Sequence, residues 1–283
     1  MKRLSIYMAC LVAAASISSC DMFKLDNYDG PNAQVYGKLL DAKTNEPIQI
    51  EAYTESTFDW GTWSTRITVK TGSLVVIEDV SDRWEGFNEE QDWMVKFNGE
   101  YRNDMVFAGK YSIDFKKLPV FSPEEAEVIT LNKGENNFDF KVTPYCRIIN
   151  PEFKYENETI TATFSVEMAD PSKVNSLVQV VLCSNTSNFV SQNFKQNGFD
   201  SGSSLNRVTV NADGTTDRIT LTIDAKKNGV NSNEFQYERE HFLRIGALAK
   251  GGAYNTQNVW NFSPVYVMGK DKKISLYDWS TAN

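Results

Sequence analysis

The chain has 283 residues, of which 41% are hydrophobic, 12% aromatic and 23% charged, and its formal net charge is −8. This apolar fraction is adequate for packed cores and excludes an intrinsically disordered chain, and the acidic balance argues against a nucleic-acid partner. A single histidine, His241, excludes most zinc sites and any catalytic centre built from several histidines.

The first twenty residues are typical of an export signal that ends in a lipidation site. Lys2 and Arg3 precede an apolar stretch, residues 4–17, that is too short to span a bilayer as a helix. The stretch ends in Ile-Ser-Ser-Cys, which resembles the lipobox of bacterial lipoproteins. That resemblance implies that residues 1–19 are removed as a signal peptide and that Cys20 carries the lipid that holds the chain to a membrane. An ordinary secretory signal with a chance cysteine is the alternative.

Removal of the leader changes the charge and the cysteine count. It takes away two basic residues and no acidic ones, so 27 Lys and Arg remain against 37 Asp and Glu, a net charge of −10. Residues 20–31 lack apolar periodicity and are predicted to be a tether. Cys146 and Cys183 lie in predicted strands of an exported protein, where either a disulfide or simple burial of two small apolar side chains is expected.

The mature chain is predicted to be β-strand almost throughout. Asn98-Gly99 is a strong hairpin signal, and residues 138–142 form the next clear strand. Apolar and polar residues alternate from Thr159 to Met168, as in a sheet with one wet face, and again over residues 219–223. A boundary near Thr143-Pro144-Tyr145 then gives two sandwiches, residues 32–144 and 145–283. A single large barrel is the alternative.

The first of these regions resembles a known family. The run Tyr36–Ile48 is similar to the opening hairpin of carboxypeptidase regulatory-like domains, with a glycine, an aspartate, a threonine and a proline at the family's spacing. Residues 95–101 and 107–111 match the later aromatic and glycine elements, with Asn98 where aspartate is commoner. The resemblance implies a transthyretin-like β-sandwich. The side chains of Asp41, Thr44 and Asn45 are of the kind that caps a turn, so they are expected to cap the first one.

Nearly the whole mature chain resembles a wider group, strongly over residues 28–145 and weakly after them. Residues 28–32, 107–111 and 140–145 occur together in uncharacterised Bacteroidota lipoproteins that are encoded beside SusC/SusD-type uptake pairs. The second region resembles an immunoglobulin or fibronectin-III sandwich, with residues 242–247 and 260–265 as its last two long strands. The resemblance implies a lipid-anchored protein of the outer membrane, at the cell surface, with a SusC/SusD-type complex as partner. It supplies neither a ligand nor a catalytic residue.

Tryptophan is the residue type that points to a ligand. Trp60 and Trp63 flank Gly61 in a polar stretch, with Asp59 and Arg66 as hydrogen-bonding neighbours, and Trp84 lies in a second aromatic and polar segment. Exposed indoles stack on the C–H faces of sugars, so these five residues are the candidate ligand site. The alternative is that the rings close the open end of the sandwich. Trp93, Trp260 and Trp279 are expected to pack in or beside the cores.

An enzyme is the less favoured class. Acidic residues are too numerous for any pair to indicate a glycosidase, and His241 is expected at a strand edge without a nucleophile elbow. No metal site or cofactor is expected, since a hairpin turn explains Asp213-Gly214. The sequence therefore predicts a non-catalytic surface lipoprotein accessory to a SusC/SusD-type uptake system and binding oligosaccharide. The main alternative is an accessory subunit without glycan affinity that docks on a transporter, such as one that imports peptides, and a carboxylate-based hydrolase is the third.

Overall fold

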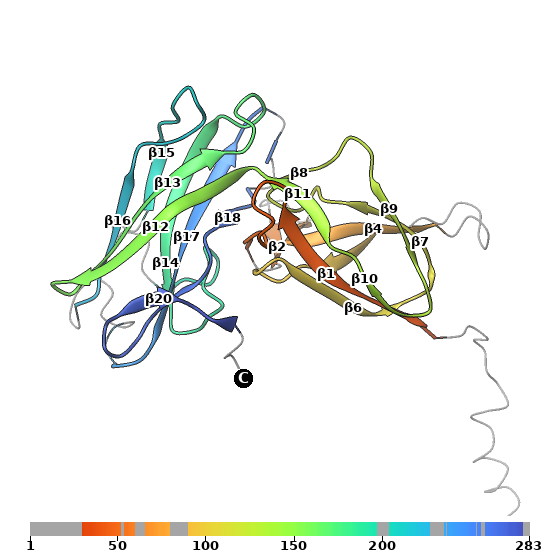
Figure 1. Cartoon of the computed structure of the whole chain (residues 1–283), viewed down its shortest axis with the longest axis horizontal. Helices are drawn as coiled ribbons and strands as arrows, with labels where there is room; N and C mark the ends of the chain where they lie inside the picture. Colours follow the sequence, from red (N-terminus) through yellow and green to blue (C-terminus); the bar gives the residue numbers. More distant parts are fainter. Residues whose placement is uncertain are drawn as a thin grey trace, which may run out of the picture.

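The computed structural model describes residues 30–51, 54–59, 66–79, 90–196, 204–226, 235, 237–252, 254–255 and 258–279, with the backbone alone for residues 54–59 and 66–71. Every named element in this part of the chain is a β-strand, so the predicted all-β class is confirmed. The strands form two groups, which we call the first half (residues 33–144) and the second half (residues 146–279), and the halves lie side by side in Figure 1.

The strands follow one another closely. Those of the first half are β1 (Ala33–Asp41), β2 (Thr54–Asp59), β3 (Arg66–Thr71), β4 (Ser73–Asp79), β5 (Glu90–Met94), β6 (Glu100–Val106), β7 (Gly109–Asp114), β8 (Val120–Phe121), β9 (Glu127–Leu131), β10 (Gly134–Asn137) and β11 (Phe140–Pro144). Those of the second half are β12 (Cys146–Glu156), β13 (Thr159–Met168), β14 (Ser176–Asn185), β15 (Ser204–Val208), β16 (Ile219–Asp224), β17 (His241–Lys250), β18 (Asn261–Phe262), β19 (Tyr266–Met268) and β20 (Ile274–Leu276).

Two sheets enclose the core of the first half. One has the order β10-β1-β11-β8, and β6 also pairs with β1. The second has the order β5-β4-β7-β9. Alternate residues of β1 are buried because successive side chains of a strand point to opposite faces. Trp93 of β5 is 1% exposed and contacts Tyr101 and Tyr111, so its predicted place in the core is confirmed.

The predicted turns of the first half are present. The Lys43 N–H donates to Asp41 Oδ1 at 2.9 Å, and the Glu46 N–H donates to Thr44 Oγ1 at 3.3 Å, so both side chains cap the turn after β1. Gly99 has φ +80°, and its N–H donates to the Lys96 carbonyl at 2.9 Å. Glycine suits that turn because residues with a Cβ rarely adopt a positive φ.

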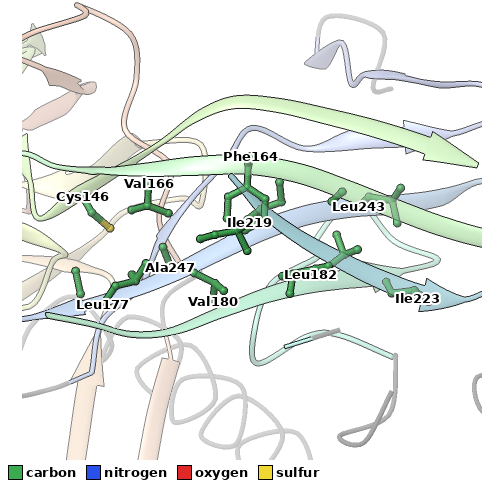
Figure 2. Close-up of a cluster of buried hydrophobic side chains, with 14 of the residues drawn as sticks. Cys146, Phe164, Val166, Leu177, Val180, Leu182, Ile219, Ile223, Leu243 and Ala247 are labelled. Atoms are coloured by element: carbon green, nitrogen blue, oxygen red, sulfur yellow. The ribbon is translucent and has the colours of Figure 1, made fainter. Parts of the chain in front are cut away.

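The second half is a sandwich of two sheets. Its first, second and fifth strands form the sheet β12-β13-β16, and the remaining strands form the sheet β15-β14-β17-β19-β20, with β18 paired to β17. The strand predicted over residues 159–168 is β13, and its apolar residues alternate as expected. Figure 2 shows Phe164 and Val166 of β13 on the side that faces Ala247 and Val180 of the other sheet.

One predicted strand and one predicted position differ from the structure. Residues 260–265 do not form a last long strand, because only Asn261–Phe262 pairs with β17 before the chain turns into β19 and β20. His241 begins β17 but is fully buried between β14 and β19, with its ring 4.5 Å from that of Phe235, because β17 is a central strand and not an edge. Cys146 and Cys183 are both buried and no disulfide joins them.

A short connection joins the halves. β11 ends at Pro144 and β12 begins at Cys146, so Tyr145 alone lies between them. The Tyr145 N–H donates to the Pro119 carbonyl at 2.9 Å, and its ring contacts Phe121 at 5.0 Å and Tyr254 at 6.4 Å. These contacts leave the linker little freedom, and contacts between the halves fix their arrangement further.

Candidate functional site

The candidate site residues named from the sequence fall mostly outside the described part of the chain. This holds for Cys20, Trp60, Trp63 and Trp84. Asp59 and Arg66 face each other in register as the last residue of β2 and the first of β3, and only their backbone is described. The structure therefore shows that residues 60–65 connect two paired strands, and the predicted role of the two indoles there stays a prediction.

A buried arginine joins the halves. Successive residues of β17 point to opposite faces, so Leu243 and Ile245 enter the sandwich core and Arg244 points out of it. Arg244 is nevertheless fully buried, because the first half covers this face. Its guanidinium donates to the carbonyls of Ile50 (3.1 Å) and Phe97 (2.9 Å) in the first half. Burial lowers the pKa of Arg244 to about 9, against the opposing effect of a nearby carboxylate, so the side chain is still protonated near neutral pH.

A second arginine crosses the junction at another point. Arg147 of β12 donates to both carboxylate oxygens of Asp41, at 2.5 and 2.8 Å, and to Glu167 at 3.1 Å. Lys43 completes the network by donating to Glu167 at 2.8 Å. Burial acts to raise the pKa of Asp41, but hydrogen bonds from Arg147 and from the Lys43 N–H outweigh it and hold that pKa below its ordinary value.

A small groove of about 190 Å³ opens beside this network. It is lined by the turn after β1, by the start of β12 and by residues 261–264. Drug-sized ligand pockets usually hold about 300–1,000 Å³. The groove is smaller than that range, and two of its three charged lining residues, Asp41 and Arg147, already bind each other, so it is a poor candidate for a ligand site.

Aromatic rings gather on the other side of Arg244. Phe97, in the turn between β5 and β6, contacts the rings of Phe189 (5.2 Å) and Trp279 (4.9 Å), and Trp279 contacts Tyr277 (4.6 Å). Phe97 is buried, Phe189 is 58% exposed, and Tyr277 and Trp279 are half-buried. We call Phe189, Tyr277 and Trp279 the aromatic surface; two of them pack on Phe97, and Tyr277 packs on Trp279. Trp279 therefore packs beside a core as expected and also presents part of its ring to solvent.

The segment that carries Phe189 is polar. Residues 185–193 contain three asparagines and a glutamine, and the amide of Asn188 donates to the Tyr277 hydroxyl at 3.3 Å. Glu51 is 6% exposed and lies near this segment. Burial raises the pKa of Glu51, although the Ser191 hydroxyl and the charge of Arg244 act in the opposite direction. Amides and hydroxyls therefore predominate beside the aromatic surface.

Other kinds of site find little support in the described residues. No group of three or more metal-binding side chains comes together there. No helix in that part of the chain has the length and hydrophobicity needed to cross a membrane. The buried ring of His241 and the ion-paired carboxylate of Asp41 are each poorly placed to move a proton to or from a ligand.

Sequence reasoning missed two residues of this junction. Arg244 is a charged residue in the otherwise apolar run Phe242–Ala249, and a buried charge needs partners, so it could have been singled out as a contact residue. Phe97 gave no such signal, because an aromatic residue before an Asn-Gly turn is equally compatible with packing inside its own half.

Comparison with known proteins gives similarity at the level of structure. No protein-family model matches the chain, and no curated protein matches its sequence. The structure of a candidate carbohydrate-binding protein from Bacteroides uniformis is similar with 28% identity and a TM-score of 0.68, over 85% of this chain and 100% of that one. DUF3823 family proteins from Parabacteroides merdae and Bacteroides ovatus are similar with 17% identity each and TM-scores of 0.61 and 0.58. They cover 84% of this chain and 98% of their own, and they share the fold.

Proposed function

We propose that the protein is a non-catalytic carbohydrate-binding protein whose aromatic surface contacts an uncharged oligosaccharide. The observation that carries the proposal is the grouping of Phe189, which is exposed, with Tyr277 and Trp279, which are half-buried: Phe189 and Trp279 pack on the buried Phe97 ring, and Tyr277 packs on Trp279. Soluble proteins normally bury such rings in their cores, and an exposed group of them marks an interaction site.

The chemistry of this surface suits a sugar. Pyranose rings present C–H-rich faces that pack on aromatic side chains, while their hydroxyls exchange hydrogen bonds with amides. Asn188, Gln192 and Asn193 place amides in the segment that carries Phe189. Amides donate and accept without carrying charge, and the mature chain has a net charge of −10, so a neutral glycan is favoured over an acidic one.

Support for binding rather than catalysis comes from two directions. Glycoside hydrolysis needs two carboxyl groups that flank a cleft, and one of them must hold a proton. Two carboxyl groups line the groove at the junction, those of Asp41 and Glu46, and Asp41 is a poor proton carrier because its pKa is lowered and its oxygens bind Arg147. The similarity to a candidate carbohydrate-binding protein extends over the whole length of that protein.

The cellular setting is part of the proposal. The leader and its Ile-Ser-Ser-Cys end support lipidation of Cys20 and anchoring at the outer membrane, facing the cell surface. Residues 28–32, 107–111 and 140–145 support a role as accessory to a SusC/SusD-type uptake complex. Similar structures come from Bacteroides and Parabacteroides, which is consistent with the resemblance to Bacteroidota proteins. The connection that carries Trp60 and Trp63, with Asp59 and Arg66 at its ends, and the segment of Trp84 remain a second candidate contact region.

The test is affinity electrophoresis of the mature chain in native gels that contain amylopectin, xyloglucan, galactomannan or inulin. We expect at least one polysaccharide to retard the protein, and the double variant Phe189→Ala with Trp279→Ala to lose about thirtyfold in affinity, since each stacked ring adds on the order of 1 kcal/mol and the two together about 2 kcal/mol. Met105→Ala is the matched control, because Met105 is an apolar side chain of the first half that is 75% exposed.

Three results would distinguish the alternatives. Unretarded wild-type protein that co-purifies with a transporter from native outer membranes would replace the proposal with the docking subunit. Retardation abolished by Trp60→Ala with Trp63→Ala, but unchanged by the Phe189 and Trp279 double variant, would move the site to residues 60–63. Release of reducing sugar from any of the four polysaccharides would make the protein a hydrolase.

A further inference from the structure

We infer that Arg244 is the positioning residue of the aromatic surface, and that this surface is a composite of both halves. The inference rests on the proposed function, because it concerns the same rings. Arg244 is fully buried, and within the described part of the chain the rings beside its guanidinium are the buried Phe97 and Phe262, so it would act through Phe97.

Phe97 is the contribution of the first half to the surface. Among the described residues, the other buried side chains of its cluster all belong to the second half. Its ring supports both Phe189 and Trp279, at 5.2 and 4.9 Å. Phe189 and Trp279 therefore keep their contact with Phe97 only while the turn at residues 96–99 is held against β17.

Arg244 holds that turn through two contacts with Phe97, one with its backbone carbonyl and one with its ring. The Nη2 group donates to the Phe97 carbonyl at 2.9 Å, and the guanidinium lies 5.5 Å from the centre of the Phe97 ring. The same guanidinium lies 4.6 Å from the Phe262 ring and donates through Nε to the Ser263 carbonyl at 2.8 Å, which fixes it to the second half. Phe97 is thereby located relative to the sheet that carries the other rings.

The remaining hydrogen bonds of the guanidinium are to Gln49 and Ile50, in the segment between β1 and β2. Nη1 donates to the Ile50 carbonyl at 3.1 Å and Nη2 to Gln49 Oε1 at 3.1 Å. The Ile50 N–H in turn donates to the Phe97 carbonyl at 3.1 Å. The planar guanidinium thus donates to acceptors on three separate segments. A lysine ammonium group, at the end of a flexible chain, does not reproduce that geometry.

The experiment compares two arginines that both cross the junction. Arg244→Lys keeps the positive charge and removes the planar guanidinium. Arg147→Lys makes the same change at the contact with Asp41, which involves no ring of the aromatic surface. The protein is labelled with 5-fluorotryptophan, and the ¹⁹F resonances of Trp279 and Trp93 are assigned with Trp279→Phe and Trp93→Phe. Binding is measured by affinity electrophoresis in the four polysaccharide gels named above.

We expect Arg244→Lys to shift the Trp279 resonance, to leave that of Trp93 in place, and to weaken retardation about tenfold, while Arg147→Lys changes none of the three. An unchanged Trp279 resonance in Arg244→Lys, or equal losses in both lysine variants, overturns the inference. If Arg244→Lys does not fold, Phe97→Leu keeps the carbonyl contact and removes the ring, and it must shift the Trp279 resonance for the inference to stand. The fluorine measurement needs no ligand, so an unretarded wild-type protein would refute the proposed function and leave the positioning role to be decided by the resonance.

Discussion

Gly37 offers a sharp test of how the first half is packed. It lies in the middle of β1, and a Cβ added there would come within 1.8 Å of the Phe138 carbonyl oxygen and 2.6 Å of its carbonyl carbon. Because these are backbone atoms, the segment between β10 and β11 would have to move as a whole. The Phe138 carbonyl accepts from the Tyr101 hydroxyl at 2.8 Å, and the Phe138 N–H donates to the Tyr36 carbonyl at 3.0 Å, so both bonds would be strained or lost.

The expected cost of Gly37→Ala follows from those contacts. Overpacking costs about 1–3 kcal/mol and each lost hydrogen bond about 1 kcal/mol, so we expect roughly 3 kcal/mol of destabilisation. At about 2–4 °C per kcal/mol, the melting temperature should fall by about 10 °C. Urea unfolding followed by circular dichroism measures the change, with Gly30→Ala as control because a Cβ at Gly30 meets nothing within 4 Å. Two variants of equal stability would refute the packing described for β1.

Three further predictions concern ionisation, anchoring and independence of the halves. Burial raises the pKa of Glu51 above its ordinary value of 4.5, so the contribution of Glu51 to stability is present at low pH and is lost as the pH rises through the raised pKa. Urea unfolding from pH 4 to 8 should therefore show wild-type protein losing stability relative to Glu51→Gln. Parallel stability curves for the two proteins would contradict this. Cys20→Ala should move the protein from the membrane fraction to the soluble fraction, and acylated intact protein in that variant would disprove the lipid site. A fragment that begins at Tyr145 should give a β-type circular dichroism spectrum and melt cooperatively, since its core cluster is formed almost entirely by its own strands; an unfolded fragment would mean that the first half is needed.

Local patterns in the sequence determined much of the secondary structure. The alternation over residues 159–168 predicted β13 to the residue, because a strand with one buried face needs an apolar side chain at every second position. The turns at Asp41–Glu46 and Asn98-Gly99 were likewise readable, because side-chain caps and a positive φ are properties of a few neighbouring residues. Residues 260–265 were misread as one strand because apolar and aromatic residues also suit the short pieces that cover a neighbouring face.

Only the tertiary structure decided which groups contact the side chains on the outer face of β17. The sequence shows an arginine among apolar residues 242–249, but its acceptors lie at residues 50, 97 and 263, and no local rule selects partners so distant in the chain. The same holds for Phe97, Phe189 and Trp279, which meet only because the first half docks on this face. Strand periodicity says which side chains of β17 leave the core of the second half, whereas the first half, packed against that face, decides which of them are buried and which rings remain at the surface.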